Sequence, residues 1–132
     1  MSRNARKNPR RGKHVDFSRP VSVKTEEFLF DLIEKKDDLF ILILDGVQDP
    51  HNLGACMRTA EGAGVDVIVA PRHRAVSVTD TVRRVACGAT ERVPFVQVTN
   101  IVYTMDRMRK SGIRLVGTAD GADTLIYDAD LT

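Results

Sequence analysis

The sequence predicts an α/β protein in which a parallel sheet is flanked by helices, and three observations support this. Short apolar runs rich in β-branched residues alternate with segments whose apolar residues recur at helical spacing. The run at 40–44, the helix-like segment after Asn52 and the run at 65–70 form a βαβ unit, which is typical of parallel sheets. The 132 residues leave room for one domain with one core.

The chain begins with a basic tail over residues 1–20, which is polar and is expected to be disordered. Six of the 20 basic residues precede the first acid, Asp16, so the rest of the chain has 14 basic residues against 18 acidic ones. A basic arm on a mildly acidic body either binds nucleic-acid phosphates or keeps the protein in solution, and the sequence leaves both open.

Residues 21–39 are expected to form a linker and a helix from Thr25 to Lys36. Thr25 is a suitable N-cap, and two glutamates follow it in the first turn. The spacing of the apolar residues predicts one buried face, made of Phe28, Leu29, Leu32 and Ile33.

A polar turn at 45–52 follows the first strand and therefore lies at the carboxyl edge of the sheet, where open α/β sheets bind ligands. Asn52 is predicted to cap the next helix, whose free amides favour an anion. Arg58 lies four residues after Gly54 and is expected to lean over it toward the turn. The simpler alternative is a capped helix in which Arg58 pairs with Glu61.

The second half of the chain predicts two more strands, at 95–98 and 113–116, which brings the sheet to four. A helix at 78–86 is expected between the second and third strands, with Ser77 and Asp80 as its capping pair. Arg83 and Arg84 on this helix are expected at the surface.

Asn100 is expected to cap the helix between the last two strands, and Gly112 to close it. The side chains predicted to be buried on this helix are Ile101, Val102, Met105 and Met108.

The pattern Asn52-x-Gly54-x-x-x-Arg58-x-Ala60, preceded by Leu-Asp-Gly-Val-x-Asp-Pro-His, resembles the first motif of the SpoU-type RNA 2′-O-ribose methyltransferases of the SPOUT superfamily. The likeness runs from about Phe40 to the C-terminus and includes segments 85–94 and 115–119. It implies the N-terminal part of a trefoil-knot fold, because the family's later Gly-rich and Ser-Leu-Asn motifs do not occur here. Residues 40–132 are thus expected to form a truncated SpoU-type domain.

The resemblance implies methyl transfer from S-adenosylmethionine to a ribose 2′-hydroxyl, with a guanosine of 23S ribosomal RNA as the expected substrate. The family assigns proton handling to Arg58, with Asn52 positioning it. Because a guanidinium stays protonated, its own chemistry favours clamping the phosphate and hydroxyl instead. The resemblance also places Gly117, Thr118 and Ala119 beside the cofactor pocket, most of which is expected to be absent, so the chain alone is expected to be inactive.

The RNA-binding residues implied are His51, Arg58, Arg72, Arg74 and Glu91. From the residues alone, a solvated loop at 72–74 is slightly favoured over an RNA-binding one. Glu91, placed near the active face by the resemblance, more simply forms a salt bridge with Arg58 or Arg92.

No metal site is predicted, because the three histidines and two cysteines are scattered. Cys56 and Cys87 are expected to be small buried residues in a reduced cytoplasm. No apolar run approaches membrane-spanning length, and the family implies RNA as partner and a homodimer at full length. An exposed parallel edge would also favour self-association of this chain.

Three alternatives stay open. The first is a noncatalytic RNA-binding or partner-binding remnant of such an enzyme. The second is part of a tRNA 2′-O-ribose methyltransferase, and the third is an unrelated α/β module with an anion site. The length of the first motif disfavours the last.

Overall fold

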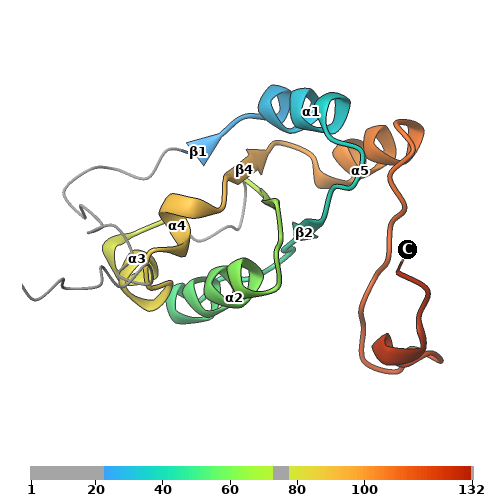
Figure 1. Ribbon diagram of the computed structural model, residues 1–132. Helices are drawn as coiled ribbons and strands as arrows, with labels where there is room; N and C mark the ends of the chain where they lie inside the picture. The colour runs from blue at the N-terminus through green and yellow to red at the C-terminus, as the bar shows by residue number, and fades with distance from the viewer. Residues whose placement is uncertain (1–22, 73–77, 132) are drawn as a thin grey trace, which may run out of the picture.

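The computed structural model describes residues 23–72 and 78–131 and contains a four-stranded parallel sheet (Figure 1). The strands are β1 (Val23–Lys24), β2 (Ile41–Ile43), β3 (Val67–Pro71) and β4 (Phe95–Val98), in the spatial order β1-β4-β3-β2. Every neighbouring pair is parallel. The predicted α/β class is confirmed, and the β4 bounds are those expected.

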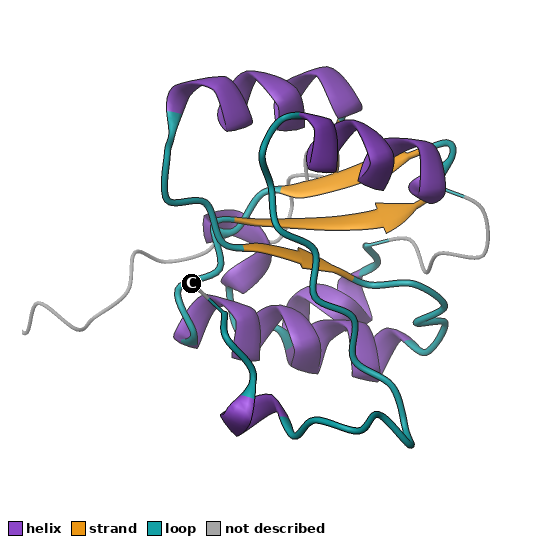
Figure 2. Ribbon diagram, turned by 90° about the vertical axis from the view of Figure 1, so that its right-hand side faces the viewer, coloured by secondary structure: helices purple, strands orange, loops and turns teal. Residues whose placement is uncertain are grey.

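Helices cover both faces of this sheet, as Figure 2 shows. They are α1 (Glu26–Lys35), α2 (Pro50–Gly62), α3 (Asp80–Val85), α4 (Ala89–Arg92) and α5 (Ile101–Lys110), followed by the 3-10 turn η1 (Ile126–Asp128). Successive side chains of a strand point to opposite faces. Val67 and Val69 of β3 therefore join the core under α1 and α5, while Ile68 and Ala70 join the core under α2, α3 and α4.

The fourth strand is not the one that the sequence predicts. Residues 113–116 form no strand, and Leu115 and Val116 are exposed. In Figure 1 the chain after α5 runs away from the sheet as an extended segment. Instead β1, inside the expected linker, pairs with β4 through Val23 and Lys24. A strand needs a neighbour for its backbone hydrogen bonds; β1 has one in β4, whereas residues 113–116 pair with no described strand.

Among α1, α3 and α5, the N-cap differs from the sequence prediction at the first two helices and agrees at the third. Thr25 precedes α1 without a side-chain cap bond. Thr79, rather than Ser77, occupies the N-cap position of α3, and its hydroxyl accepts from the Val82 amide at 3.5 Å. Ser77 lies outside the described residues, as does the basic tail. Asn100 caps α5 as predicted, accepting from the Tyr103 amide at 3.0 Å.

The burial predictions are wrong at Val102 and at both cysteines, and the surface prediction for Arg83 is wrong as well. Val102 is 73% exposed, and Thr104 takes the buried position on α5, where its single O–H lies within hydrogen-bond distance of both the Glu26 carboxylate and the Asn100 carbonyl. Cys56 is only half-buried, and Cys87 is exposed in the turn between α3 and α4 with a positive φ of 52°. No helix among the described residues is long and apolar enough to cross a membrane.

Candidate functional site

The turn after β2 is closed by Asp49, not by Asn52. The Asp49 carboxylate accepts from the His51 amide at 2.8 Å and from the Asn52 amide at 3.1 Å, and Pro50 fills the first helical position. Proline suits that position because the amide it lacks would have no helical partner. The predicted Asn52 cap is wrong. Because Asp49 already places a negative charge at this helix terminus, α2 presents less free positive potential to an external anion than expected.

Gly54 serves helix packing rather than access to Arg58. A Cβ atom at Gly54 would lie 2.7 Å from the Val85 Cβ and 2.9 Å from the Val82 carbonyl oxygen. Only hydrogen fits between α2 and α3 at this contact. The expectation that Gly54 is open for an arginine side chain to lie over it is therefore wrong.

Arg58 is exposed, and its side chain makes no hydrogen bond or ion pair with any described residue. The predicted alternative, a pair with Glu61, is wrong because Glu61 binds Arg92. His51 lies seven residues before Arg58, which is about two helical turns, so both stand on one face of α2. Arg58 is thus a cation available to a ligand, with an exposed imidazole on the same face.

Asn52 and Arg58 do not share a face. They are six residues apart, which separates them by about 120° around the helix and about 9 Å along it. Asn52 is exposed, and its side chain has no partner among the residues that the structure describes. A ligand touching both would have to wrap around the amino-terminal half of α2.

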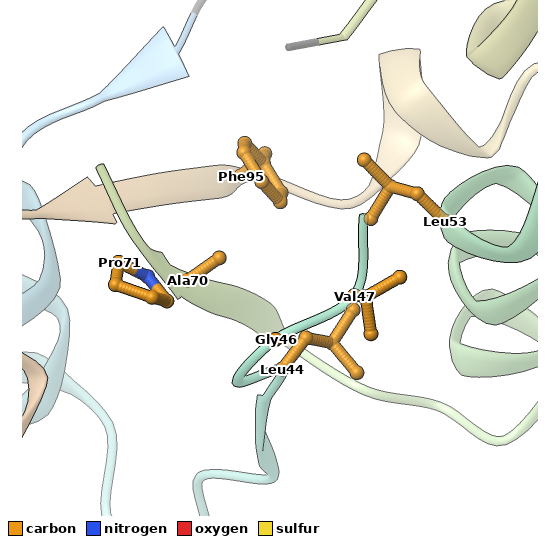
Figure 3. Close-up of a pocket in the computed structure, with 7 residues that line it drawn as sticks. All are labelled: Leu44, Gly46, Val47, Leu53, Ala70, Pro71 and Phe95. Carbon is orange, nitrogen blue, oxygen red and sulfur yellow. The ribbon is translucent and has the colours of Figure 1, made fainter. Parts of the chain in front are cut away.

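The carboxyl edge of the sheet has one small cavity of about 10 Å³ (Figure 3). This is about the space of a single water molecule. Its lining carries no charged or polar side chain and consists of Leu44, Gly46, Val47, Leu53, Ala70, Pro71 and Phe95. The cavity is a gap in the core rather than a site for a polar ligand.

Arg72 stands at the same carboxyl edge. Its amide donates to the Val98 carbonyl at 2.7 Å, which ties the end of β3 to the end of β4. The side chain is exposed and, like that of Arg58, has no partner in the described part of the chain. Arg74 lies outside the described residues.

Glu91 does not pair with Arg58 or Arg92, as the sequence suggested. It accepts from the Arg83 guanidinium at 3.0 Å, and Arg83, expected at the surface, has a side chain only 4% exposed. The pair bridges α3 and α4. Because α4 leads through Pro94 into the amino end of β4, Glu91 lies toward the edge opposite the start of α2. No spacing signal reveals this pair, since it spans a break between two helices.

The turn Gly117–Thr118–Ala119 is exposed, and it lines neither the cavity at the carboxyl edge nor the hollow between β2 and α2. The structure does not bring it together with Arg58 or Asn52. Within residues 23–72 and 78–131, no group of three or more His, Cys, Asp or Glu side chains could hold a metal ion.

The features that characterise the site are a parallel α/β sheet, a polar turn that leads from β2 into α2, and an exposed arginine, Arg58, on that helix. The family model described as "SpoU rRNA Methylase family" matches residues 39–132, and the chain belongs to this family.

Among its relatives is the 23S rRNA (guanosine-2′-O-)-methyltransferase RlmB of Coxiella burnetii. The two are 53% identical over 108 residues, which is 81% of this chain and 43% of the relative. The chain therefore spans less than half the length of that relative.

Two solved structures share the fold. An RNA 2′-O ribose methyltransferase superposes with a TM-score of 0.62 at 24% identity, covering 71% of this chain and 36% of that one. The SpoU methyltransferase AviRb of Streptomyces viridochromogenes, in complex with AdoMet, gives a TM-score of 0.52 at 24% identity over 61% of this chain and 32% of its own.

Proposed function

We propose that this chain carries part of the catalytic domain of an S-adenosylmethionine-dependent methyltransferase that acts on a guanosine 2′-hydroxyl in 23S ribosomal RNA. The observation that carries the proposal is the 53% identity over 108 residues to a protein of that name. The proposal includes RNA as partner, a homodimer for the whole enzyme and a place in the cytoplasm.

Arg58 is the residue proposed to contact the reacting ribose. It is exposed, charged and uncommitted to any described partner, and its planar fork matches phosphate geometry. Holding a phosphate with one arm and the neighbouring 2′-hydroxyl with the other would fix the nucleophile in line for attack. Asn52, on the adjoining face, is proposed to position the RNA, and His51 and Arg72 to bind its backbone.

The described residues do not by themselves form a site for S-adenosylmethionine. The cavity at the carboxyl edge holds about one water molecule, and the turn at 117–119 is exposed. The cofactor site therefore requires further protein, and no step through the cofactor is derived from these residues. We expect this chain alone not to bind S-adenosylmethionine at micromolar concentration, which calorimetry would test.

This lack of a donor pocket favours a second candidate for the chain by itself, an RNA-binding module without activity. The guanidinium groups of Arg58 and Arg72, with the imidazole of His51 beside them, would still bind phosphates, with the salt dependence typical of such contacts. Filter binding of a 23S RNA fragment across salt concentrations tests this role.

The methyltransferase proposal is tested in a chimera. Residues 39–132 replace the matching segment of the Coxiella burnetii relative, and methylation of a 23S RNA transcript is measured under single-turnover conditions. The chimera should methylate a guanosine ribose in 23S RNA and leave transfer RNA unmodified. Methylation of transfer RNA instead would favour that alternative substrate.

In the same chimera, Arg58→Ala should lower the rate at least about 100-fold while leaving the thermal melt unchanged, since Arg58 contacts no described residue. Arg58→Lys should rescue poorly, because a point charge does not reproduce the planar fork. Arg109→Ala is the matched control, an exposed arginine on α5 paired with Asp106. Equal rates for Arg58→Ala and the parent chimera would remove Arg58 from the reaction.

A further inference from the structure

Glu61 on α2 is bound by Arg92 at the end of α4, and this pair occupies both oxygens of the carboxylate. The Arg92 Nε donates to one Glu61 oxygen, and Nη2 donates to the other at 3.0 Å. Two parallel hydrogen bonds of this kind make an arginine–carboxylate pair both strong and fixed in orientation. The Glu61 carboxylate is therefore committed to α4.

The turn between α3 and α4 gives Arg92 a third hydrogen bond. Cys87 and Gly88 have φ values of 52° and 85°, and a residue with a side chain rarely adopts the first of these conformations. The Cys87 carbonyl in this turn accepts from the Arg92 Nη2 at 3.2 Å. The guanidinium is thus held by the backbone of its own turn while it binds Glu61 on the neighbouring helix.

Glu61 is also the acceptor side chain closest to Arg58 along α2. Residues three and four positions apart are neighbours on the surface of a helix. For Arg58 these neighbours are Gly54, Ala55, Glu61 and Gly62, of which Glu61 alone has a polar side chain. A Glu61 carboxylate released by Arg92 would therefore have Arg58 within reach, as the sequence by itself suggests.

We propose that Arg92 is a positioning residue for methyl transfer, which acts by holding the Glu61 carboxylate away from Arg58. With Glu61 engaged, the Arg58 guanidinium remains available to RNA, and no unpaired carboxylate stands one turn from the phosphate that it binds. The inference rests on the role proposed above for Arg58. It assigns Arg92 no contact with the reacting ribose.

A released Glu61 would slow the reaction in two ways. An exposed pair three residues apart would occupy Arg58 in about half to two thirds of the molecules, which lowers the rate about two- to threefold. The unpaired carboxylate, some 6–8 Å (roughly one turn) from the bound phosphate, would lower it by about another two- to threefold through repulsion. The combined loss is about four- to ninefold, below that expected for Arg58→Ala because part of the Arg58 population stays free.

The test compares three variants in the chimera that carries residues 39–132, by single-turnover methylation of a 23S RNA transcript at subsaturating concentration. Arg92→Gln should be about four- to ninefold slower than the parent chimera. Glu61→Gln and the double variant Glu61→Gln, Arg92→Gln should both stay within about twofold of the parent, because neither leaves a carboxylate beside Arg58. Arg92→Lys should keep most of the rate, since a lysine still binds Glu61.

The two single glutamine variants are matched controls for stability, because each breaks the same salt bridge between α2 and α4. A merely structural role for that bridge predicts similar losses of rate in both and no recovery in the double variant. Thermal melts of all the variants check that the fold persists.

A second measurement on the 132-residue chain needs neither RNA nor the cofactor. Phenylglyoxal modifies guanidinium groups, more slowly when a carboxylate binds them, and mass spectrometry of the digested chain reads each arginine separately. Modification of Arg58 should be about two- to threefold slower in Arg92→Gln than in the parent, and should recover in the double variant with Glu61→Gln. Arg72, exposed and distant from Glu61 along the sheet, is the internal standard and should react equally in all of them.

The proposal is overturned if Arg92→Gln methylates at the parent rate, if Glu61→Gln is as slow as Arg92→Gln, or if the double variant does not recover. Unchanged reactivity of Arg58 toward phenylglyoxal in Arg92→Gln overturns it as well. Arg58→Ala separates this failure from that of the proposed function. If Arg58→Ala is slow while Arg92→Gln is not, the role of Arg58 stands and only that of Arg92 falls; parent rates for both remove the two roles together.

Discussion

Replacing Gly54 by alanine tests the packing of α2 against α3. In an open helical position this change should stabilise the protein by about 0.5–1 kcal/mol, because glycine has the poorer helix propensity. At Gly54 the added methyl would sit 2.7 Å from the Val85 Cβ and 2.9 Å from the Val82 carbonyl oxygen. Since one of these is backbone, α3 must move as a unit. Overpacking of this kind costs about 1–3 kcal/mol.

After the gain in propensity is subtracted, the expected net effect is a loss of up to about 2.5 kcal/mol, with a middle value near about 1 kcal/mol. For a chain of this size, each kcal/mol lost lowers Tm by about 3–5 °C. Urea denaturation and a thermal melt measure both quantities. Gly54→Ala should create no contact with the exposed Arg58 side chain, so the loss of stability reports on helix packing alone.

Gly62 supplies the matched control on the same helix. It is the last residue of α2, and a Cβ there would meet nothing within 4 Å. Gly62→Ala should therefore be neutral or stabilise slightly. A rise in Tm for Gly54→Ala, equal to that for Gly62→Ala, would refute the packing argument and return Gly54 to the role of clearing space for Arg58.

Three further predictions follow from the described contacts. Asp49→Ala should cost about 1 kcal/mol in urea denaturation by removing the cap of α2, whereas Asn52→Ala should stay within about 0.5 kcal/mol; the reverse order would restore Asn52 as the cap. Glu91→Ala should cost about 2 kcal/mol because it removes an acceptor from the buried Arg83 guanidinium, and Glu91→Gln should cost less; equal, negligible losses would mean that water replaces the carboxylate. The hydrogen bond from Lys36, with that from the Phe40 amide, lowers the pKa of Asp66, so its contribution to stability is present above pH about 4 and is lost as pH falls through the folded pKa. The free energy of unfolding, measured from pH about 2.5 to about 5.5, which is about 1.5 units on either side of that value, should fall less with acid in Asp66→Asn than in the parent chain.

Local sequence determined the central part of the fold. The apolar runs at 40–44, 65–70 and 95–98 became β2, β3 and β4 with shifts of at most two residues. The residues of each of these strands are buried or half-buried on both faces of the sheet, so a continuous apolar run is enough to predict the strand. Asn100 was also predictable, because a cap bond reaches only three residues along the chain.

The cap of α2 was within reach of the sequence but was assigned to the wrong residue. Asp49 and Asn52 are both good caps, and the composition of the turn does not choose between them. Pro50 does, because proline prefers the first helical position and so makes the residue before it the cap.

The family also came from the sequence, since its motif is a continuous stretch of the chain. The sequence did not predict the contacts that residues of this likeness make between helices. Gly54 lies against Val85 and Glu91 against Arg83, and in each case the partners belong to different helices.

Only the tertiary structure chose the strand that pairs with β4 and left the segment at 113–116 without one. Apolar alternation shows that a segment is able to form a strand, but a strand also requires an open edge within reach for its backbone hydrogen bonds. The sequence therefore determined which segments are apolar and which residues cap their own helices. The arrangement of helices and strands decided which edges are filled, which charges are buried, and which arginines, Arg58 and Arg72 among them, remain available to a ligand.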